Sequence, residues 1–311
     1  MPNKLLLVAA ENERMRGIVS QSSLTRGIVH RFVAGEQDRE VIAVARRLTG
    51  TGLRVTIDHL GEGTTTLEQA EGIRDTYLAL LSSLHAADLA AAAEVSLKIS
   101  ALGGSLPAGG YDHAARLTHD VCAAAAAVGS TVTIDMEDHT TVDATLSILD
   151  ELRTEFPWVG VALQACLRRT AADCRRLAHA GSRVRLVKGA YAEPASVAFV
   201  SKREVDDEFR RCLRILMEGD GYPMIATHDP KLIEYTLRLA RDGGRGAEDY
   251  EFQMLYGIRE NEQLRLAANG YRTRVYLPYG RDWYAYFMRR LAEKPANLLL
   301  LARSFKPGSA N

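Results

Sequence analysis

Midway along the chain lies the run Arg183-Val184-Arg185-Leu186-Val187-Lys188, in which arginine alternates with apolar residues. Short β-branched or apolar runs of this kind are typical of strands buried in a sheet. Successive side chains of a strand point to opposite faces, so Arg183 and Arg185 share one face and Val184 and Leu186 share the other. If the arginine face points inward, the sheet encloses a guanidinium group.

Similar runs recur roughly every 30 to 40 residues on both sides of this one, each followed by a polar cluster and a helical pattern. We predict eight strands, at residues 53–57, 94–99, 131–136, 160–164, 183–187, 223–226, 250–254 and 273–276. Long amphipathic stretches between them predict crossover helices, for example at 66–87, 111–128, 142–155 and 230–241.

This alternation predicts an α/β fold, a single (β/α)8 TIM-type barrel, over a closed sheet of parallel strands. A chain of 311 residues with 47% hydrophobic residues is long enough to form such a barrel as one domain. We therefore assign 1–311 to one domain, with 1–50 as an N-terminal helical arm or cap and a C-terminal helix over the barrel mouth. A doubly wound open sheet stays an alternative, because counting units does not prove closure.

The bulk charge and the cysteines exclude several classes of protein. Lys plus Arg equals Asp plus Glu at 39 each, so no overall field favours nucleic acid. The four cysteines form no C-x-x-C pair, which favours reduced packing thiols in a cytoplasmic protein over a zinc site or a disulfide framework. The apolar run at 5–10 is too short to span a membrane and lacks the cleavage site of a signal peptide.

Polar residues end most of the predicted strands. In a TIM-type barrel the active site lies at the carboxyl ends of the strands, so these residues form one candidate site. Lys98 and Asp135 lie within otherwise apolar runs, where an unpaired charge would cost several kcal/mol. Either a ligand or an internal salt bridge such as Arg185 to Asp135 would compensate them. The candidates are Asp58, His59, Lys98, Ser100, Asp135, Glu137, Asp138, Gln164, Lys188, Thr227, His228, Gln253 and Tyr276.

Several common motifs are missing. No G-x-G-x-x-G follows a strand and no phosphate-binding G-x-x-x-x-G-K-[ST] occurs, so a dinucleotide would not be bound in Rossmann fashion. No serine lies in a G-x-S-x-G turn and no H-E-x-x-H appears. The densest set of metal-binding residue types is Asp135, Glu137, Asp138 and His139, but strand alternation sends Asp138 to the opposite side from Asp135 and Glu137. We expect no metal site.

The segment 276–293 carries two adjacent arginines, Arg289 and Arg290, on a predicted helix that Asp282 would cap. Two guanidinium groups beside aromatic rings would bind a small carboxylate through paired hydrogen bonds. Taken alone, the same pattern also fits an amphipathic helix with a solvated basic edge.

Between about residues 31 and 293 the chain resembles the proline dehydrogenase family of FAD-dependent barrels. The pieces that carry the resemblance fall in order at the ends of successive predicted strands, with the paired arginines after the eighth. They are Arg31-Phe-Val-Ala-Gly35, Asp58-His-Leu-Gly61-Glu62, Leu97-Lys98-Ile-Ser100, Ile134-Asp135-Met-Glu137, Arg185-Leu-Val-Lys188-Gly189-Ala-Tyr191, Ala226-Thr227-His228, Glu251-Phe-Gln253-Met-Leu255-Tyr-Gly257 and the 276–293 segment.

The resemblance implies roles for individual residues. Lys98, Arg289 and Arg290 would bind the carboxylate of proline, and Tyr191, Leu255 and Tyr276 would pack around its ring. Asp135 would orient these substrate-binding residues, and Arg185 would lie near the flavin N5. The remaining cofactor residues would be Gln164, Val187, Gly189, Ser201, Lys202, Thr227, His228, Gln253 and Glu293. Ser201 departs from the threonine of the family's Thr-Lys pair, which puts that contact in doubt.

The resemblance also implies a reaction and its partners. Hydride would pass from L-proline to N5 of FAD, giving Δ1-pyrroline-5-carboxylate in the first step of proline catabolism. Electrons would then pass to a quinone, which implies peripheral contact with the inner face of the cell membrane, and an aldehyde dehydrogenase is a possible downstream partner. Two alternatives are a Schiff-base lyase that uses Lys98 or Lys188 and a barrel that serves only as a scaffold.

Overall fold

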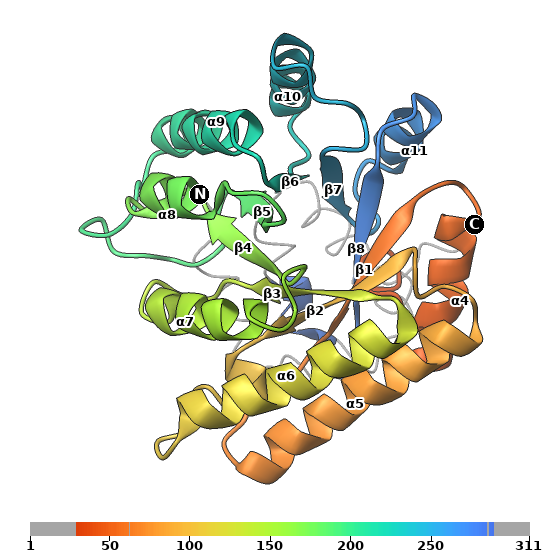
Figure 1. The fold of residues 1–311 in the computed structure, drawn as a ribbon. Helices are drawn as coiled ribbons and strands as arrows, with labels where there is room; N and C mark the ends of the chain where they lie inside the picture. Colours follow the sequence, from red (N-terminus) through yellow and green to blue (C-terminus); the bar gives the residue numbers. More distant parts are fainter. Residues whose placement is uncertain (1–28, 62, 285, 289–311) are drawn as a thin grey trace, which may run out of the picture.

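The computed structural model describes residues 29–61, 63–284 and 286–288. Its parallel strands pair in sequence order, and β8 pairs with β1, so the sheet is a closed barrel (Figure 1). The prediction of a TIM-type barrel is confirmed and the open-sheet alternative is wrong. The strands are β1 (Arg54–His59), β2 (Ala93–Lys98), β3 (Thr131–Asp135), β4 (Gly160–Gln164), β5 (Arg183–Val187), β6 (Tyr222–Ala226), β7 (Glu251–Leu255) and β8 (Thr273–Tyr279).

Helices surround the barrel on its outer side (Figure 1). They are α4 (Asp38–Thr49), α5 (Leu67–Ala86), α6 (Gly110–Val128), α7 (Val142–Arg153), α8 (Thr170–Leu177), α9 (Lys202–Glu218), α10 (Pro230–Asp242) and α11 (Glu260–Ala268), with a 3-10 turn, η1 (Ser100–Leu102), after β2. The four helices predicted from amphipathic spacing are α5, α6, α7 and α10, and each begins and ends close to the predicted residues.

Local sequence explains where several helices begin. The Thr66 hydroxyl accepts a hydrogen bond from the backbone N–H of Gln69, and the Gln69 side-chain oxygen accepts one from the backbone N–H of Thr66, which makes a capping box for α5. Asp229 caps α10 through the backbone of Lys231, and Pro230 occupies the first helical position, where no N–H is needed. These caps determine where the loop between β1 and α5 and the loop between β6 and α10 end, at the mouth of the barrel.

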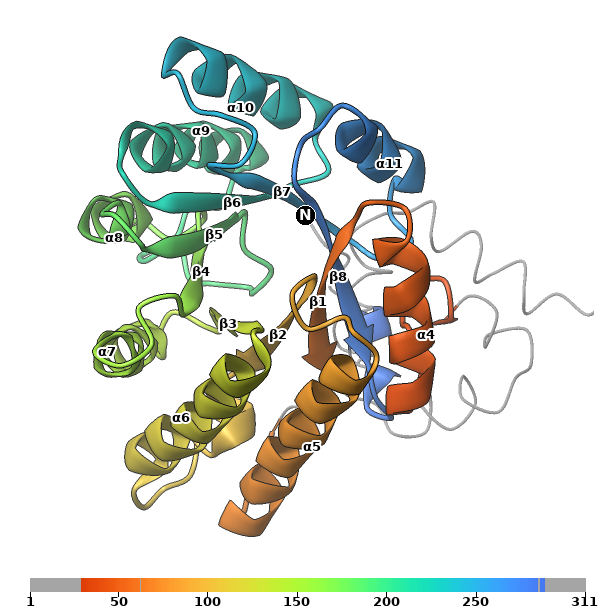
Figure 2. The ribbon, with the colours of Figure 1, turned by 45° about the vertical axis from the view of Figure 1, so that its right-hand side comes forward.

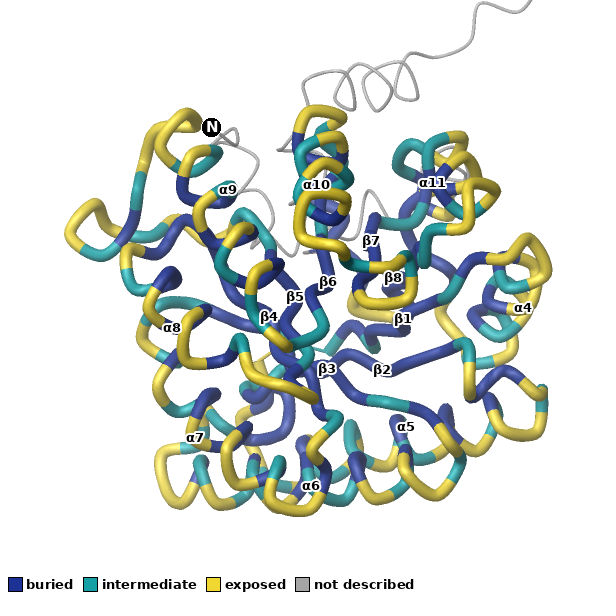
Figure 3. The backbone as a smooth tube through the Cα atoms, turned by 45° about the horizontal axis from the view of Figure 1, so that its top comes forward, coloured by how far each residue is buried: buried dark blue, intermediate teal, exposed yellow. Residues whose placement is uncertain are grey.

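The apolar core of this barrel lies outside the strands, between them and the helices. On β2, for example, Val95 and Leu97 are fully buried and belong to that core. Figure 3 shows the strands buried at the centre and the exposed residues gathered on the outer faces of the helices. Because alternate side chains point to opposite faces, the inside of the barrel receives the polar residues of each strand.

Part of the N-terminal extension lies within the outer ring of helices, where α4 packs against β1 and α5 (Figure 2). The residues after β8 form a second apolar cluster, in which Trp283 and Phe287 pack with Phe32 and with Leu60 at the carboxyl end of β1. The apolar run at 5–10 and most of the predicted C-terminal helix lie outside the described residues. That the whole chain 1–311 is one domain stays a prediction.

Candidate active site at the carboxyl ends of the strands

Charged side chains fill the inside of the barrel. Glu94 of β2 is fully buried and accepts a hydrogen bond of 2.7 Å from Arg183. Arg183 lies on β5, which is not a neighbour of β2 in the sheet, so this contact crosses the barrel interior. The arginine face of β5, whose direction the sequence left open, therefore points to the inside of the barrel.

Arg185 is the centre of this interior network. Its guanidinium is buried, with 2% of the residue exposed. It donates to Gln253 Oε1 at 2.6 Å, Ser96 Oγ at 2.9 Å, Asp135 Oδ1 at 2.5 Å and Glu94 Oε1 at 3.0 Å. Burial works against the charge, but Asp135 and Glu94 outweigh it and raise the pKa of Arg185 above its ordinary value. Arg185 is thus a fixed cation inside the barrel, and the expected salt bridge to Asp135 is present.

A second layer lies beneath Arg185, toward the amino ends of the strands. Arg274 of β8 donates to both carboxylate oxygens of Glu251, at 2.7 and 3.1 Å, and lies 3.9 Å from Glu94. Burial raises the pKa of Glu94, but the surrounding arginines, Arg274 first among them, lower it far below the ordinary value. Sequence reasoning did not single out Glu94, although its spacing of two from Ser96 and four from Lys98 placed it on the polar face.

Asp135 joins Arg185 to the aromatic residue at the end of the barrel. The Tyr276 hydroxyl donates to Asp135 Oδ2 at 2.6 Å, and the Arg185 guanidinium lies 5.4 Å from the centre of the Tyr276 ring. Burial, followed by the charge of Asp135, raises the pKa of Tyr276 well above 10. Tyr276 is therefore a neutral phenol that donates a hydrogen bond to Asp135, and this bond fixes the orientation of its ring.

Lys98 ends β2 on the same inner face. Its ammonium nitrogen lies 3.0 Å from both carboxylate oxygens of Asp58, near the end of the neighbouring strand β1. In the register of the barrel Lys98 lies beside Asp135 of β3. Lys98, Asp135, Arg185 and Tyr276, predicted separately from four strands, therefore meet in one cluster.

The predicted cofactor residues line the ends of β4 to β7. Gln164 donates from its amide nitrogen to the carbonyl oxygens of Met136 and Glu137, at 3.0 and 2.8 Å. His228 Nε2 accepts from the backbone of Leu255 at 2.9 Å, so a ring proton resides on Nδ1. The Thr227 hydroxyl accepts from the backbone N–H of Asp229.

Gly189, which follows β5, has a positive φ of 104°. A Cβ there would lie 2.2 Å from the sulfur of Cys166, so only glycine fits. The loop after β5 therefore packs closely against the loop after β4. The Cys166 N–H also donates to the Lys188 carbonyl at 2.8 Å, which joins the same two loops. Val187 ends β5 immediately before this turn.

Two lysines lie near the start of α9. Lys188 contacts Asp206 at 2.5 Å and lies 3.7 Å from Asp229, while Lys202 also pairs with Asp206. Ser201 is the N-cap of α9, where its hydroxyl accepts from the backbone of Glu204 and donates to that side chain. Ser201, which stands where the family pattern has a threonine, therefore caps α9.

Some predicted residues are less constrained or fall outside the description. Tyr191 is 40% exposed on the loop after β5, and Leu255 is half-buried at the end of β7. Arg289, Arg290 and Glu293 lie outside the described residues.

Among the residues that the structure describes, no group of three or more His, Cys, Asp or Glu side chains could hold a metal ion. In this same part of the chain, no helix is long and apolar enough to cross a membrane. The four cysteines are buried and unpaired by disulfides, as predicted.

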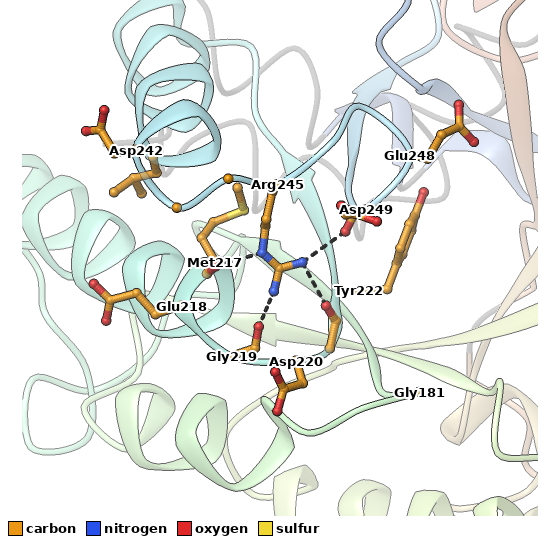
Figure 4. Close-up of a pocket in the computed structure, with 14 residues that line it drawn as sticks. Gly181, Met217, Glu218, Gly219, Asp220, Tyr222, Asp242, Arg245, Glu248 and Asp249 are labelled. Carbon is orange, nitrogen blue, oxygen red and sulfur yellow. Dashed lines mark hydrogen bonds between the residues drawn. The ribbon is translucent and has the colours of Figure 1, made fainter.

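A hollow of about 720 Å³ lies at the opposite end of the barrel, among the loops that lead into β5, β6 and β7 (Figure 4). Its wall includes Arg245, which donates to the backbone carbonyls of Met217, Gly221 and Asp249, among others. The Arg245 guanidinium thus connects these loops through hydrogen bonds. The hollow is remote from the strand-end cluster, and we assign it no part in the chemistry.

Comparison with known proteins identifies the family of this chain and agrees with its fold. The model of a family described as proline dehydrogenase matches residues 41–303, which include every strand of the barrel. This chain belongs to the proline dehydrogenase family. It is an oxidoreductase of the monofunctional bacterial type, and the resemblance inferred from the sequence is confirmed.

Individual relatives agree with this assignment. The proline dehydrogenase of Deinococcus radiodurans is 38% identical over 98% of both chains, and proline dehydrogenase 1 of Bacillus subtilis is 39% identical over 88% of this chain and 89% of its own. Among solved structures, proline utilization A from Bdellovibrio bacteriovorus, inactivated by N-propargylglycine, superimposes with a TM-score of 0.81 at 25% identity. That match covers 94% of this chain and 35% of the larger protein.

Proposed function

We propose that this family member oxidises L-proline to Δ1-pyrroline-5-carboxylate with FAD as hydride acceptor, as the first step of proline catabolism, and that its electrons pass to a quinone. The observation that carries the proposal is the connected cluster of Lys98, Asp135, Arg185 and Tyr276 at the strand ends. Each of these residues falls at a position where the family pattern implies substrate or flavin chemistry.

The substrate carboxylate would be bound by cations from two places. Lys98 presents its ammonium from β2, at the inner face of the barrel, and Arg289 with Arg290 would approach from the segment after β8. Charge-assisted hydrogen bonds to a carboxylate are about twice as strong as neutral ones, and three cations would hold it in one orientation. Orientation matters here because hydride transfer requires the ring carbon next to nitrogen to face the acceptor.

The proline ring would pack against Tyr191, Leu255 and Tyr276. Asp135 fixes the Tyr276 ring through the 2.6 Å hydrogen bond, and therefore fixes one wall of this pocket. The partial exposure of Tyr191 is compatible with a wall that only the substrate completes.

The donor groups of the mouth fit FAD. Arg185 supplies a permanent cation in a buried setting, and Lys188 and Lys202 supply two more near the start of α9, which suits an electron-rich ring and a pyrophosphate. The cofactor residues would be Gln164, Arg185, Val187, Gly189, Ser201, Lys202, Thr227, His228, Gln253 and Glu293. FAD supplies the hydride acceptor, at N5, that the protein itself lacks. Arg185 would stabilise negative charge that develops nearby, and no general base is required if the substrate amine arrives neutral.

The proposed partners follow from the reaction. A quinone acceptor implies that the enzyme is cytoplasmic with peripheral contact to the inner face of the membrane. The product would be a substrate for an aldehyde dehydrogenase, and no nucleic acid takes part.

The contacts of the two lysines weigh against the Schiff-base alternative. A nucleophilic lysine needs a neutral amine, whereas Lys98 lies against Asp58 and Lys188 lies against Asp206, and these carboxylates stabilise ammonium ions.

An anaerobic titration tests the proposal. The purified protein should be yellow with a flavin spectrum, and L-proline should bleach it stoichiometrically. A colourless protein that borohydride traps with a carbonyl substrate would instead establish the lyase.

A further inference from the structure

Asp58 is a buried carboxylate directly beneath the proposed substrate cation Lys98. It is the next-to-last residue of β1, and the register of the barrel places it beside Ser96 of β2, one inward-facing position below Lys98. Its side chain is 2% exposed, whereas that of Lys98 is 12% exposed. The lysine side chain is thus less deeply buried than the carboxylate that it contacts.

The geometry of this pair constrains the lysine more than a single contact would. Both oxygens of Asp58 lie 3.0 Å from Lys98 Nζ, so the carboxylate is shared evenly by the ammonium. A lysine side chain has four rotatable bonds and much rotamer entropy, which makes it a poorly directed cation when it has no fixed partner. Asp58 supplies such a partner from a strand of the barrel.

We propose that Asp58 is a positioning residue, which holds the Lys98 ammonium where it binds the substrate carboxylate. The inference rests on the proposed function, since it concerns the same substrate. It adds a residue to which neither the sequence pattern nor the family resemblance gave a role.

The surroundings of Asp58 make this positioning sensitive to pH. Burial raises the pKa of Asp58 from 3.8 to about 6, although the charge of Lys98 opposes the rise and the charge of Asp135 adds to it. The titratable groups that face Asp58 are Lys98 of β2, Asp135 of β3, Tyr276 and Tyr279 of β8, and Tyr77 of α5. Burial raises the pKa of each of the three tyrosines well above 10, so they stay neutral at acid pH.

The sign of the pH effect follows. Above about pH 6 Asp58 is ionised and holds the ammonium, whereas below it the protonated acid offers Lys98 one neutral carbonyl oxygen in place of a charged pair. Binding of a carboxylate at Lys98 should therefore weaken as the pH falls through about 6.

The test measures equilibrium binding to the FAD-loaded protein. Tetrahydrofuran-2-carboxylate is a suitable probe, because it replaces the ring nitrogen of proline by oxygen and so has no amine to titrate or oxidise. Its dissociation constant is taken from the change in flavin absorbance at pH 7.5 and at pH 5. The proteins compared are wild type, Asp58→Asn, Asp58→Glu and Asp173→Asn. Asp173 is a matched control, because it is a buried carboxylate paired with Arg169 at 2.8 Å and lies on α8, in the outer ring of helices.

We expect Asp58→Asn to raise the dissociation constant about tenfold at pH 7.5, the effect of losing one charge-assisted contact. Wild type should weaken by a similar factor between pH 7.5 and 5, while Asp58→Asn should change little. Asp58→Glu should recover part of the affinity and the pH dependence, and Asp173→Asn should behave as wild type. The pH series on wild type tests the proposal even if Asp58→Asn does not fold.

Two kinds of failure are distinguishable. If proline does not bleach the flavin of the wild-type protein and the probe does not bind, the proposed function is wrong, and the role of Asp58 is wrong with it. If wild type is bleached and binds the probe, and Asp58→Asn binds the probe equally or more tightly at pH 7.5, or wild type shows no pH dependence, then only the role of Asp58 is overturned.

Discussion

At the scale of single residues, the site is built from charges that already have partners in the protein. Arg185 has four protein acceptors, and two of them are carboxylates. Its removal would take the Arg185 ion pair from Asp135 and one of three arginines from the buried Glu94, and breaking such a pair costs about 3 to 5 kcal/mol of stability. Arg185 therefore combines a structural role with the proposed role near the flavin.

The paired arginines should control substrate binding. We expect Arg289→Met or Arg290→Met to leave FAD bound and to lower kcat/KM for proline by about 2 to 4 kcal/mol, because each loses a charge-assisted contact in a pocket poor in water. Steady-state kinetics with flavin content as the control would measure this. Unchanged kinetics in both variants would remove the arginines from the site.

Tyr276 should control selectivity. A hydroxyl at carbon four of the proline ring, buried against Tyr276 without a partner, would cost about 1 to 3 kcal/mol, so wild type should prefer proline to trans-4-hydroxyproline by at least about tenfold. Tyr276→Ser should narrow that preference, mainly through lost activity on proline. Tyr276→Phe keeps the ring and removes only the bond to Asp135, so it should retain the preference. Equal ratios of kcat/KM in wild type and Tyr276→Ser would show that the ring is not a wall of the pocket.

At the scale of elements, the two ends of the barrel have separate tasks. Loops at the carboxyl ends of the strands hold the proposed site, and loops at the amino ends hold the helices in place. Arg245, in the loop between α10 and β7, donates to the Met217 carbonyl at the end of α9 and to the Gly221 carbonyl in the loop between α9 and β6. Burial lowers the pKa of Arg245, and the charges of Asp249 and Asp220 oppose that shift.

Arg245→Ala should therefore destabilise the fold without altering catalysis. Loss of hydrogen bonds to several half-buried carbonyls should lower the free energy of unfolding by about 2 to 3 kcal/mol. Urea unfolding would give the change, and the KM for proline should stay at the wild-type value. A changed KM at unchanged stability would contradict this division of tasks.

At the scale of the whole molecule, buried ion pairs connect strands that are not neighbours in the sheet. Glu94 of β2 contacts Arg183 and Arg185 of β5 and lies near Arg274 of β8, so a single carboxylate links three sides of the barrel. Layers of apolar side chains commonly fill such barrels, and here charges take that place.

Glu94→Gln should weaken the whole barrel in a pH-dependent way. Removal of this charge should lower the free energy of unfolding by about 3 to 5 kcal/mol at pH 7, because three arginines lose a buried counter-ion. The folded pKa of Glu94 lies below 4.5, so its contribution is fully present above that pH and is lost as the pH falls toward the folded value. Urea unfolding at pH 7 and pH 4 should show a smaller difference from wild type at pH 4. A difference that grows on acidification would contradict this role.

The sequence by itself determined the barrel and named the candidate residues of the site. Apolar and polar patterns depend only on neighbouring positions, so they located all eight strands and showed which side chains of a strand share a face, but not which face points inward. Ordered family motifs then indicated the proposed chemistry. The tertiary structure alone decided which charges meet. Glu94 and Arg183 are 89 positions apart and Asp58 and Lys98 are 40 apart, and such pairings depend on closure and register, which no local pattern records.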